Sequence, residues 1–367
     1  MFGVALDASD DPMSLELKWA SMLSAGGAGN GIHADPYDAM AGSLEARDDF
    51  QLAGKFPVPS WLGPRPLPAD HSLLTLENFR RFYERRGFLD ASEGIRDFVK
   101  QHIFPDSPVM IGIDHSATGG VVSALSERYG SRNLAVIVLD RHFDGIGLSC
   151  RLAADAALQR DGRAVPPEMM PFSTLEAEEY CCGSFWAYLM NAGLVLPQNL
   201  LFIGVADYPE RNDAGDGWQG FREAYLDYEE KGCRYFPLRR FAEPYLDELS
   251  RFIDQHVTTP YLYVSLDVDV GSLNCVHAAR YMDGPGISRQ NLLDVARAIA
   301  KKVQGGAVSL AGFDIMEFNM HFLGIRTEDG LRDRTLEVVR EFIGLLLPGM
   351  PVRSGELACS GQYESTV

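Results

Sequence analysis

The sequence of 367 residues lacks any long apolar run and any excess of basic residues. A membrane-spanning helix needs about 18 or more consecutive apolar residues, and no run here approaches that length. The chain carries 33 Lys and Arg against 51 Asp and Glu, which gives a formal net charge of −18. Such a chain repels nucleic acid phosphates and anionic lipid. We therefore expect neither nucleic acid nor a membrane as a partner.

Cysteine is also sparse, and its spacing excludes two further classes of protein. Six cysteines are scattered without a C-x-x-C pair, so neither a disulfide-rich secreted domain nor a zinc ribbon is indicated. The first eleven residues, "MFGVALDASDD", are acidic and lack the basic segment of a secretory signal. We expect a cytoplasmic protein.

Apolar, β-branched runs recur along the chain and alternate with segments of helical spacing. Runs that are apolar on both faces are typical of a parallel sheet that is covered on each side by helices. The pattern therefore predicts an α/β fold. The predicted strands lie at 108–113, 134–139, 200–205, 261–266 and 308–316.

The spacing also divides the chain into three parts. Residues 1–104 are less regular and rich in Gly and Pro loops, and we expect them to form an N-terminal extension of loops and helices. Residues 105–347 carry the alternating strands and helices of the main domain. Residues 348–367 are polar and irregular, and are expected to be a tail without a core of its own.

The stretch "AVIVLDRHFDG" places three metal-ligand side chains directly after a predicted strand. Asp140, His142 and Asp144 occupy alternate positions and would point the same way if the extended backbone continued. Taken alone, this motif is more often a helix cap followed by a surface histidine than a metal site. Two adjacent carboxylates repel each other unless a positive charge lies between them.

Other strands end in the same kind of residue. Asp267 and Asp269 follow a second predicted strand, His115 follows a third, and Glu317 follows a fourth. Because the carboxyl ends of parallel strands meet at one edge of the sheet, these side chains should lie together. A set of carboxylates and imidazoles without thiolates suits Mn(II) or a similar ion better than structural zinc. Six ligands are too many for one tetrahedral ion, so two ions are expected.

These motifs, "DHS", "DRHFD", "SLDVD" and "GFDIMEFN", resemble those of the ureohydrolase superfamily, which includes arginase, agmatinase and formiminoglutamase. The resemblance covers about residues 105–325 and follows the family's order. It implies a three-layer α/β/α sandwich around a mainly parallel sheet. It also implies a homo-oligomer, usually a trimer or hexamer, and a cationic small-molecule substrate.

The resemblance implies a role for each matching residue. His115 and Asp144 would hold one Mn(II) ion, His142 and Asp269 the other, and Asp140 and Asp267 would bridge them. Ni(II), Co(II) and Fe(II) are the alternative metals.

The expected reaction is hydrolysis of a C–N bond in a guanidino or formimino compound. A hydroxide between the ions would attack the planar carbon, releasing urea or a related amide together with an amine. Asp144 would relay a proton, and Glu317 would orient the cationic group of the substrate.

Four features depart from the family pattern. Cys182 stands where family members carry a proton-shuttling histidine, and it is either a catalytic thiol or a buried small side chain. The Asp-Pro pair that usually follows the D-x-D motif is missing. About 37 residues separate Asp144 from Cys182, longer than in typical arginases, so substrate recognition is hard to predict. Arg141 replaces a residue that is usually small.

Two other functions stay open from the sequence. The chain could be a deacetylase-like amide hydrolase, which would need only one metal ion. It could also be a non-catalytic, metal-binding regulatory homologue, because a fold and a site do not guarantee activity. The complete set of six ligand positions favours a two-metal hydrolase.

Overall fold

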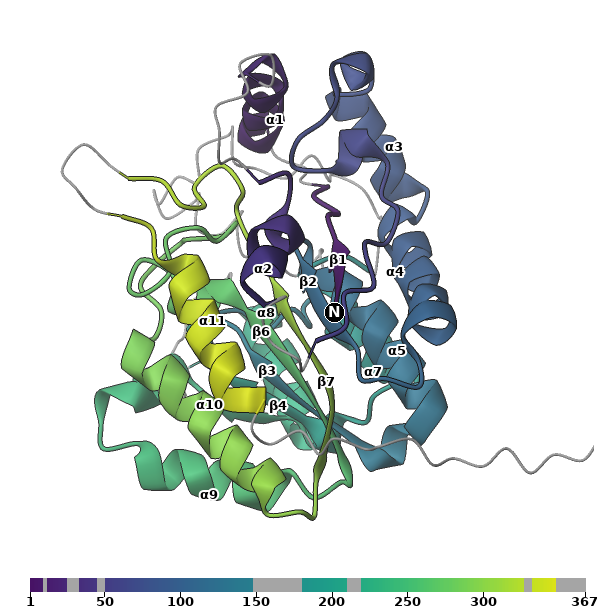
Figure 1. Ribbon diagram of the computed structural model, residues 1–367. Coiled ribbons are helices and arrows are strands. Elements are labelled where there is room, and N and C mark those ends of the chain that lie inside the picture. Colours follow the sequence, from purple (N-terminus) through teal and green to yellow (C-terminus); the bar gives the residue numbers. More distant parts are fainter. Residues whose placement is uncertain are drawn as a thin grey trace, which may run out of the picture.

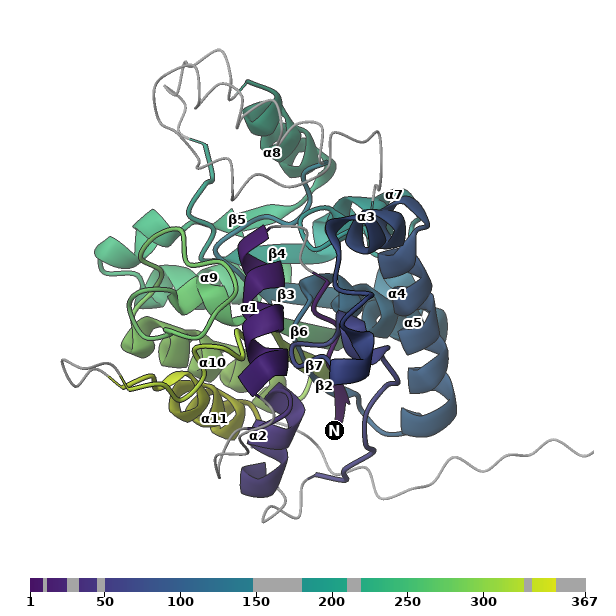
Figure 2. The same ribbon diagram turned by 90° about the horizontal axis from the view of Figure 1, so that it is seen from above.

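The computed structural model describes residues 1–8, 12–24, 33–44, 50–147, 180–209, 219–326 and 332–347. These residues form one parallel sheet of seven strands with helices packed on both of its faces (Figures 1 and 2). The predicted α/β/α sandwich is thereby confirmed. None of the described helices is both long and apolar enough to cross a membrane.

The strands follow the order β1-β2-β7-β6-β3-β4-β5 across the sheet. All five predicted strands are present, with slightly shorter bounds at some ends. Two strands at the edges of the sheet, β1 and β5, have only three residues each. The strands are β1 Phe2–Val4, β2 Val109–Gly112, β3 Leu134–Leu139, β4 Leu200–Ile203, β5 Arg234–Phe236, β6 Tyr261–Asp267 and β7 Ser309–Met316.

Strand β1 joins the first residues of the chain to the main domain. Phe2 and Val4 pair in parallel with Met110 and Gly112 of β2. The stretch expected to be an N-terminal extension therefore contributes an edge strand to the sheet itself. The predicted tail, 348–367, lies outside the described residues.

The two faces of the sheet bury separate hydrophobic clusters. In β3, Ala135, Ile137 and Leu139 pack in one cluster, while Val136 and Val138 pack in the other. This alternation explains why the strand is apolar at every position.

Helices α2, α9, α10 and α11 pack in the first cluster, and α3, α4, α5, α7 and α8 in the second (Figure 2). The α-helices are α1 Pro12–Ser24, α2 Pro36–Leu44, α3 Leu76–Glu84, α4 Gly87–Phe98, α5 Thr118–Tyr129, α7 Phe185–Asn191, α8 Gln219–Lys231, α9 Leu246–His256, α10 Arg289–Gln304 and α11 Thr335–Leu346. Short helical turns are η1 Ser60–Leu62, η2 Pro68–Asp70, η3 Val99–Ile103, η4 His115–Ala117, η5 Ser131–Asn133, η7 Pro197–Asn199, η8 Leu238–Ala242 and η9 Val268–Gly271.

The register of the central strands brings the candidate site residues to one edge. Leu139 pairs with Leu266, so the residues that follow, Asp140 and Asp267, leave the sheet side by side. Asp267 pairs in turn with Met316, directly before Glu317. Four neighbouring strands, β2, β7, β6 and β3, thus end at the same place, which is where α/β sheets bind their ligands.

Candidate metal centre

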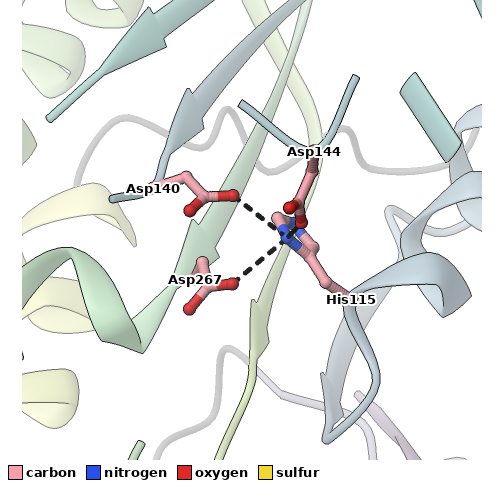
Figure 3. A group of neighbouring side chains, drawn as sticks. All are labelled: His115, Asp140, Asp144 and Asp267. Carbon is pink, nitrogen blue, oxygen red and sulfur yellow. Dashed lines mark hydrogen bonds and ion pairs between the residues drawn. The ribbon is translucent and has the colours of Figure 1, made fainter. Parts of the chain in front are cut away.

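Three carboxylates surround one ring nitrogen of His115 (Figure 3). The Nδ1 atom lies 2.9 Å from an oxygen of Asp144, 3.2 Å from one of Asp267 and 3.3 Å from one of Asp140. His115 begins η4, and its ring lies opposite Asp140 and Asp267 in Figure 3, with Asp144 above it. Side chains far apart in sequence therefore form one compact group of potential ligands.

A second group overlaps the first through Asp140. The Nδ1 atom of His142 lies 2.9 Å from Asp269 and 3.7 Å from Asp140. Within each group, the potential ligand atoms lie within 4.8 Å of one another. The structure thus brings together all six of the side chains predicted as metal ligands, in two groups that share a carboxylate.

Hydrogen bonds from backbone to carboxylate hold the bridging acids in place. Asp140 accepts the N–H of His142 at 2.6 Å, and Asp267 accepts the N–H of Asp269 at 2.8 Å. Each bond closes a tight turn of the Asx type and brings the ligand two residues later toward the same space. One oxygen of each acid is fixed by the backbone, and the other faces the centre.

Strand alternation is not what aligns Asp140, His142 and Asp144. The strand β3 ends at Leu139, and the chain then turns, with Asp144 in the left-handed region at φ 49°. Glu317 has a similar backbone, with φ 66°. Non-glycine residues adopt this conformation at some cost in energy and are often found at functional sites.

Burial and crowding shift the protonation of the acids. Burial, together with the nearby charges of Asp144 and Asp269, raises the pKa of Asp140 to about 8. Burial likewise raises the pKa of Asp267 well above its ordinary value, with Asp269 and Asp140 as the neighbouring charges. In the absence of a cation, the protein can accommodate these acids only by holding protons among them.

For each of the two histidines, burial and the neighbouring carboxylates shift the pKa in opposite directions. Burial lowers the pKa of His115, but hydrogen bonds to Asp140 and Asp144 outweigh it and raise that pKa well above the ordinary value. For His142, burial again lowers the pKa, and the charge of Asp269 raises it well above the ordinary value. A metal ion at Nδ1 would supply the positive charge that these protons supply now.

Two buried carboxylate oxygens indicate that the residues suit a cation. Oδ2 of Asp140 and Oδ2 of Asp269 are buried and have no hydrogen-bond partner of acceptable geometry in the described part of the chain. Buried polar atoms without a partner are rare and costly, so they need an explanation. Each oxygen lies beside a histidine Nδ1, and a divalent ion would satisfy both kinds of atom. The donor set therefore suits metal ions.

A buried hydrogen-bond network orients the ring of His115. Its Nε2 lies 2.9 Å from Oγ of Ser265, which donates to Asp314 at 2.7 Å. Asp314 also accepts hydrogen bonds from Thr118 at 2.6 Å and Tyr263 at 2.7 Å. Because the Ser265 hydroxyl is used as a donor, it accepts from Nε2–H. A metal ion can therefore replace the proton on Nδ1, whose lone pair points at the acids.

The ring of His142 is oriented by a different carboxylate, that of Asp283. Its Nε2 lies 3.2 Å from Asp283, which also pairs with Nε of Arg141 at 2.6 Å. Arg141 donates through its side chain to the carbonyl of Pro285 at 2.6 Å and through its backbone N–H to Asp269 at 3.2 Å. The arginine that departs from the family pattern therefore connects the loop at Asp283 to a predicted metal ligand.

Glu317 lies beside the acidic centre and is buried among charged partners. It accepts the backbone N–H of His115 at 2.8 Å, and its carboxylate lies 3.4 Å from a guanidinium nitrogen of Arg280. Burial raises the pKa of Glu317 to about 8, opposed by the charge of Arg280. The predicted substrate-orienting carboxylate is therefore already close to a cation of the protein itself.

Cys182 lies at the edge of this region and is half-buried. Its sulfur is 3.9 Å from the hydroxyl of Tyr281. A hydrogen bond with Cys181 raises the pKa of Cys182 well above its ordinary value, and burial and the charge of Asp114 raise it further. These surroundings hold the thiol in its neutral form. The catalytic role of Cys182 stays a prediction. If Cys182 takes part in the reaction, it does so as a neutral thiol and not as a thiolate.

The fold and the site together define an α/β protein with a cluster of acidic and histidine side chains, candidates for metal binding, at the carboxyl ends of its strands. A sequence model of the Arginase family matches residues 69–325, more than half of the chain. The chain therefore belongs to the arginase family, which confirms the resemblance to the ureohydrolases. No match was found among the curated proteins.

Solved structures of ureohydrolases share the fold. Proclavaminate amidino hydrolase from Streptomyces clavuligerus aligns with a TM-score of 0.54 at 18% identity, covering 95% of this chain and 89% of that one. Arginase from Bacillus subtilis gives 0.56 at 14%, covering 94% and 96%. Formimidoylglutamase from Bacillus subtilis subsp. subtilis str. 168 gives 0.54 at 15%, covering 95% and 85%.

Three residues that the sequence analysis gave no role, Ser265, Asp283 and Arg280, contact the site residues, and a fourth, Asp314, acts through Ser265. Ser265 and Asp314 are polar positions within buried, apolar strands, and that contrast could have revealed them. Asp283 and Arg280 lie in the irregular segment between β6 and α10, where no periodicity marks them. Their contacts depend on the tertiary fold.

We predict that Ser265→Ala weakens one metal site selectively. Without the serine oxygen, the ring of His115 loses the acceptor that fixes its tautomer, and the affinity for the ion at His115 should fall by about 10–100-fold. Titration with Mn(II), followed by the signal of the free ion, measures both sites. The companion variant Asp283→Ala should weaken the ion at His142 instead. Equal losses at both sites in either variant would contradict these assignments.

We also predict an inverse pH dependence of stability for the metal-free protein. Asp140, Asp267, His115 and His142 have raised pKa values, so the folded chain holds protons that the unfolded chain releases, from about pH 4 for the acids and from about pH 6.5 for the histidines. Stability should then fall as the pH rises from about 5 through about 8, the pKa of Asp140, lowering Tm in chelator by about 2–4 °C or more. Mn(II) should raise Tm most at the higher pH, because binding displaces these protons.

The control for this experiment is Asp140→Asn, which cannot take up the proton and should therefore show a smaller pH dependence in chelator. A Tm of the metal-free wild type that rises with pH over the same range would rule out the protonated acidic centre.

Proposed function

We propose that this protein is a two-metal hydrolase that cleaves a C–N bond of a guanidino or formimino compound. It would release urea or a related amide together with an amine. Membership of the arginase family and the cluster of ligands support a hydrolase of the ureohydrolase type. The observation that carries the two-metal proposal is the sharing of Asp140 between two separate groups of ligand atoms.

The ligand geometry supports a division of the six side chains between two ions. His115 and Asp144 would hold the first ion, and His142 and Asp269 the second. Asp140 and Asp267 leave neighbouring strands side by side and would contact both. When bound, Mn(II) or a similar divalent ion supplies positive charge and acidifies a water molecule for attack on the substrate carbon. Ni(II), Co(II) and Fe(II) suit the same donors.

The chain's own residues then have distinct tasks. Asp144, held in a left-handed conformation, accepts and relays a proton at its carboxylate. Glu317 orients the planar group of the substrate, since its Oε2 is buried without a hydrogen-bond partner among the described residues. Cys182 would meet the leaving amine as a neutral thiol.

We expect about two Mn(II) ions per chain in the wild-type protein. Asp267→Ala should lose both ions, because Asp267 would contact each of them and its removal takes one carboxylate from each site. Elemental analysis after purification with Mn(II), and again with Ni(II), measures the content. One ion per chain would favour a deacetylase-like hydrolase, and none would favour a non-catalytic homologue.

We further expect Glu317→Gln to separate metal binding from substrate binding. The amide retains the shape of the side chain but loses the charge, so both ions should stay bound. Turnover of guanidino and formimino compounds, followed by release of urea or formamide, should fall by about 100-fold or more. Unchanged kcat and KM would remove Glu317 from the site.

A further inference from the structure

Two adjacent cysteines, Cys181 and Cys182, lie in the turn that precedes α7. Cys181 is buried, with 3% of its surface exposed, and Cys182 is half-buried. Both are free, and their thiols are hydrogen-bonded to each other. The proposed reaction gives a task to Cys182 alone, so it does not account for the pairing of the two thiols.

Backbone hydrogen bonds fix the turn that carries this pair. The N–H of Cys181 donates to Oγ of Ser184 at 3.2 Å, and the N–H of Ser184 donates to the carbonyl of Cys181 at 3.0 Å. The N–H of Ile146 donates to the carbonyl of Gly183 at 3.1 Å, which ties the turn to the segment that follows Asp144. The two sulfurs are therefore held together in advance, and a ligand that joins them has little ordering cost to overcome.

The half-buried thiol of Cys182 lies at the edge of the candidate metal centre. Its sulfur is 3.9 Å from the hydroxyl of Tyr281, a side chain that is 40% exposed. The charges of Asp114 and Glu317 also act on this thiol. A small ligand can therefore reach Cys182 from the solvent beside Tyr281 and then meet Cys181 behind it.

The spacing of the two thiols determines what can join them. A disulfide needs sulfurs about 2.05 Å apart and usually Cα atoms at least about 4.4 Å apart. Consecutive residues across a trans peptide have Cα atoms only about 3.8 Å apart, so a disulfide between neighbours is strained. Sulfurs at hydrogen-bond distance are instead spaced like two ligands of one larger atom.

The number of available ligands narrows the choice of that atom. Zinc is almost always bound by about four ligands, and the groups of three or more potential metal ligands within the described ranges include no cysteine. A trivalent organic arsenical forms three bonds, of which one goes to its organic substituent. Two thiols complete it, and thiols are the soft ligands that such an atom prefers.

We propose that Cys181 and Cys182 form a dithiol site that captures a trivalent organic arsenical at the edge of the candidate metal centre. The inference is independent of the proposed function. The thiol of Cys182 adds across the As=O bond of an arsine oxide, which makes one S–As bond and an As–OH group. The thiol of Cys181 then makes the second S–As bond, and its proton leaves with the hydroxyl as water. Arsenic stays trivalent, so neither an oxidant nor a reductant is needed.

Phenylarsine oxide is the probe, added to the Mn(II)-loaded protein after reduction and removal of the reductant. Intact mass spectrometry counts the arsenic bound per chain, and peptide mapping locates it. Cys181→Ser and Cys182→Ser each leave one thiol of the pair. Cys233→Ser is the matched control, because it removes a free, buried cysteine whose thiol donates to Sδ of Met190.

The wild type and Cys233→Ser should each carry arsenic on the peptide that holds residues 181 and 182. Dithiothreitol should release it, whereas mercaptoethanol at the same thiol concentration should not. Cys181→Ser and Cys182→Ser should bind the probe at least about 100-fold more weakly, because the second S–As bond is intramolecular and gains from a high effective concentration. The Mn(II) content should be the same with and without the probe, since neither cysteine is a predicted ligand.

Undiminished affinity in Cys182→Ser, or arsenic located at any other cysteine of the wild type, would overturn the proposal. If Cys181→Ser does not fold, Cys182→Ser and the peptide map of the wild type decide the question. A reduced wild type that takes up no arsenic, but closes the pair as a disulfide in hydrogen peroxide, would also overturn it, in favour of a redox role.

Discussion

The mutual repulsion of buried acids is the constraint on which this structure depends. Asp140, Asp144, Asp267 and Asp269 meet at the carboxyl ends of β3 and β6, where burial and crowding raise the pKa of Asp140 to about 8. A folded chain can bury these four acids together only if positive charge lies among them. Protons on the histidines supply that charge in the metal-free state, and the geometry of the oxygens suits divalent ions.

Four neighbouring strands of the sheet end at the same edge, and this brings the acids and the histidines together. Two of the acids at those ends, Asp140 and Asp267, accept the N–H group two residues later, and this fixes one oxygen and directs the other inward. Behind the ligands, Asp314 and Asp283 orient the two histidines. The apolar strands supply rigidity, because they are buried on both faces and cannot adjust without disturbing the core.

The fold and the ligand set were largely predictable, because both depend on patterns that are local in sequence. Apolar runs marked the five long strands, whereas β1 and β5 are too short to produce such a signal. The six side chains predicted as ligands do come together, but the turn after Leu139 and the left-handed backbone of Asp144 leave no signal in the sequence pattern. Arg280 could not have been found from spacing, since its importance arises only where the fold places it against Glu317.

Anomalous diffraction at the manganese edge, from crystals grown with Mn(II), tests the central claim most directly. The account predicts two peaks per chain, one beside Nδ1 of His115 and Asp144 and the other beside Nδ1 of His142 and Asp269. Asp140 and Asp267 should lie between the two peaks. A single peak, or two that do not share these carboxylates, would contradict the assignment of a two-metal centre.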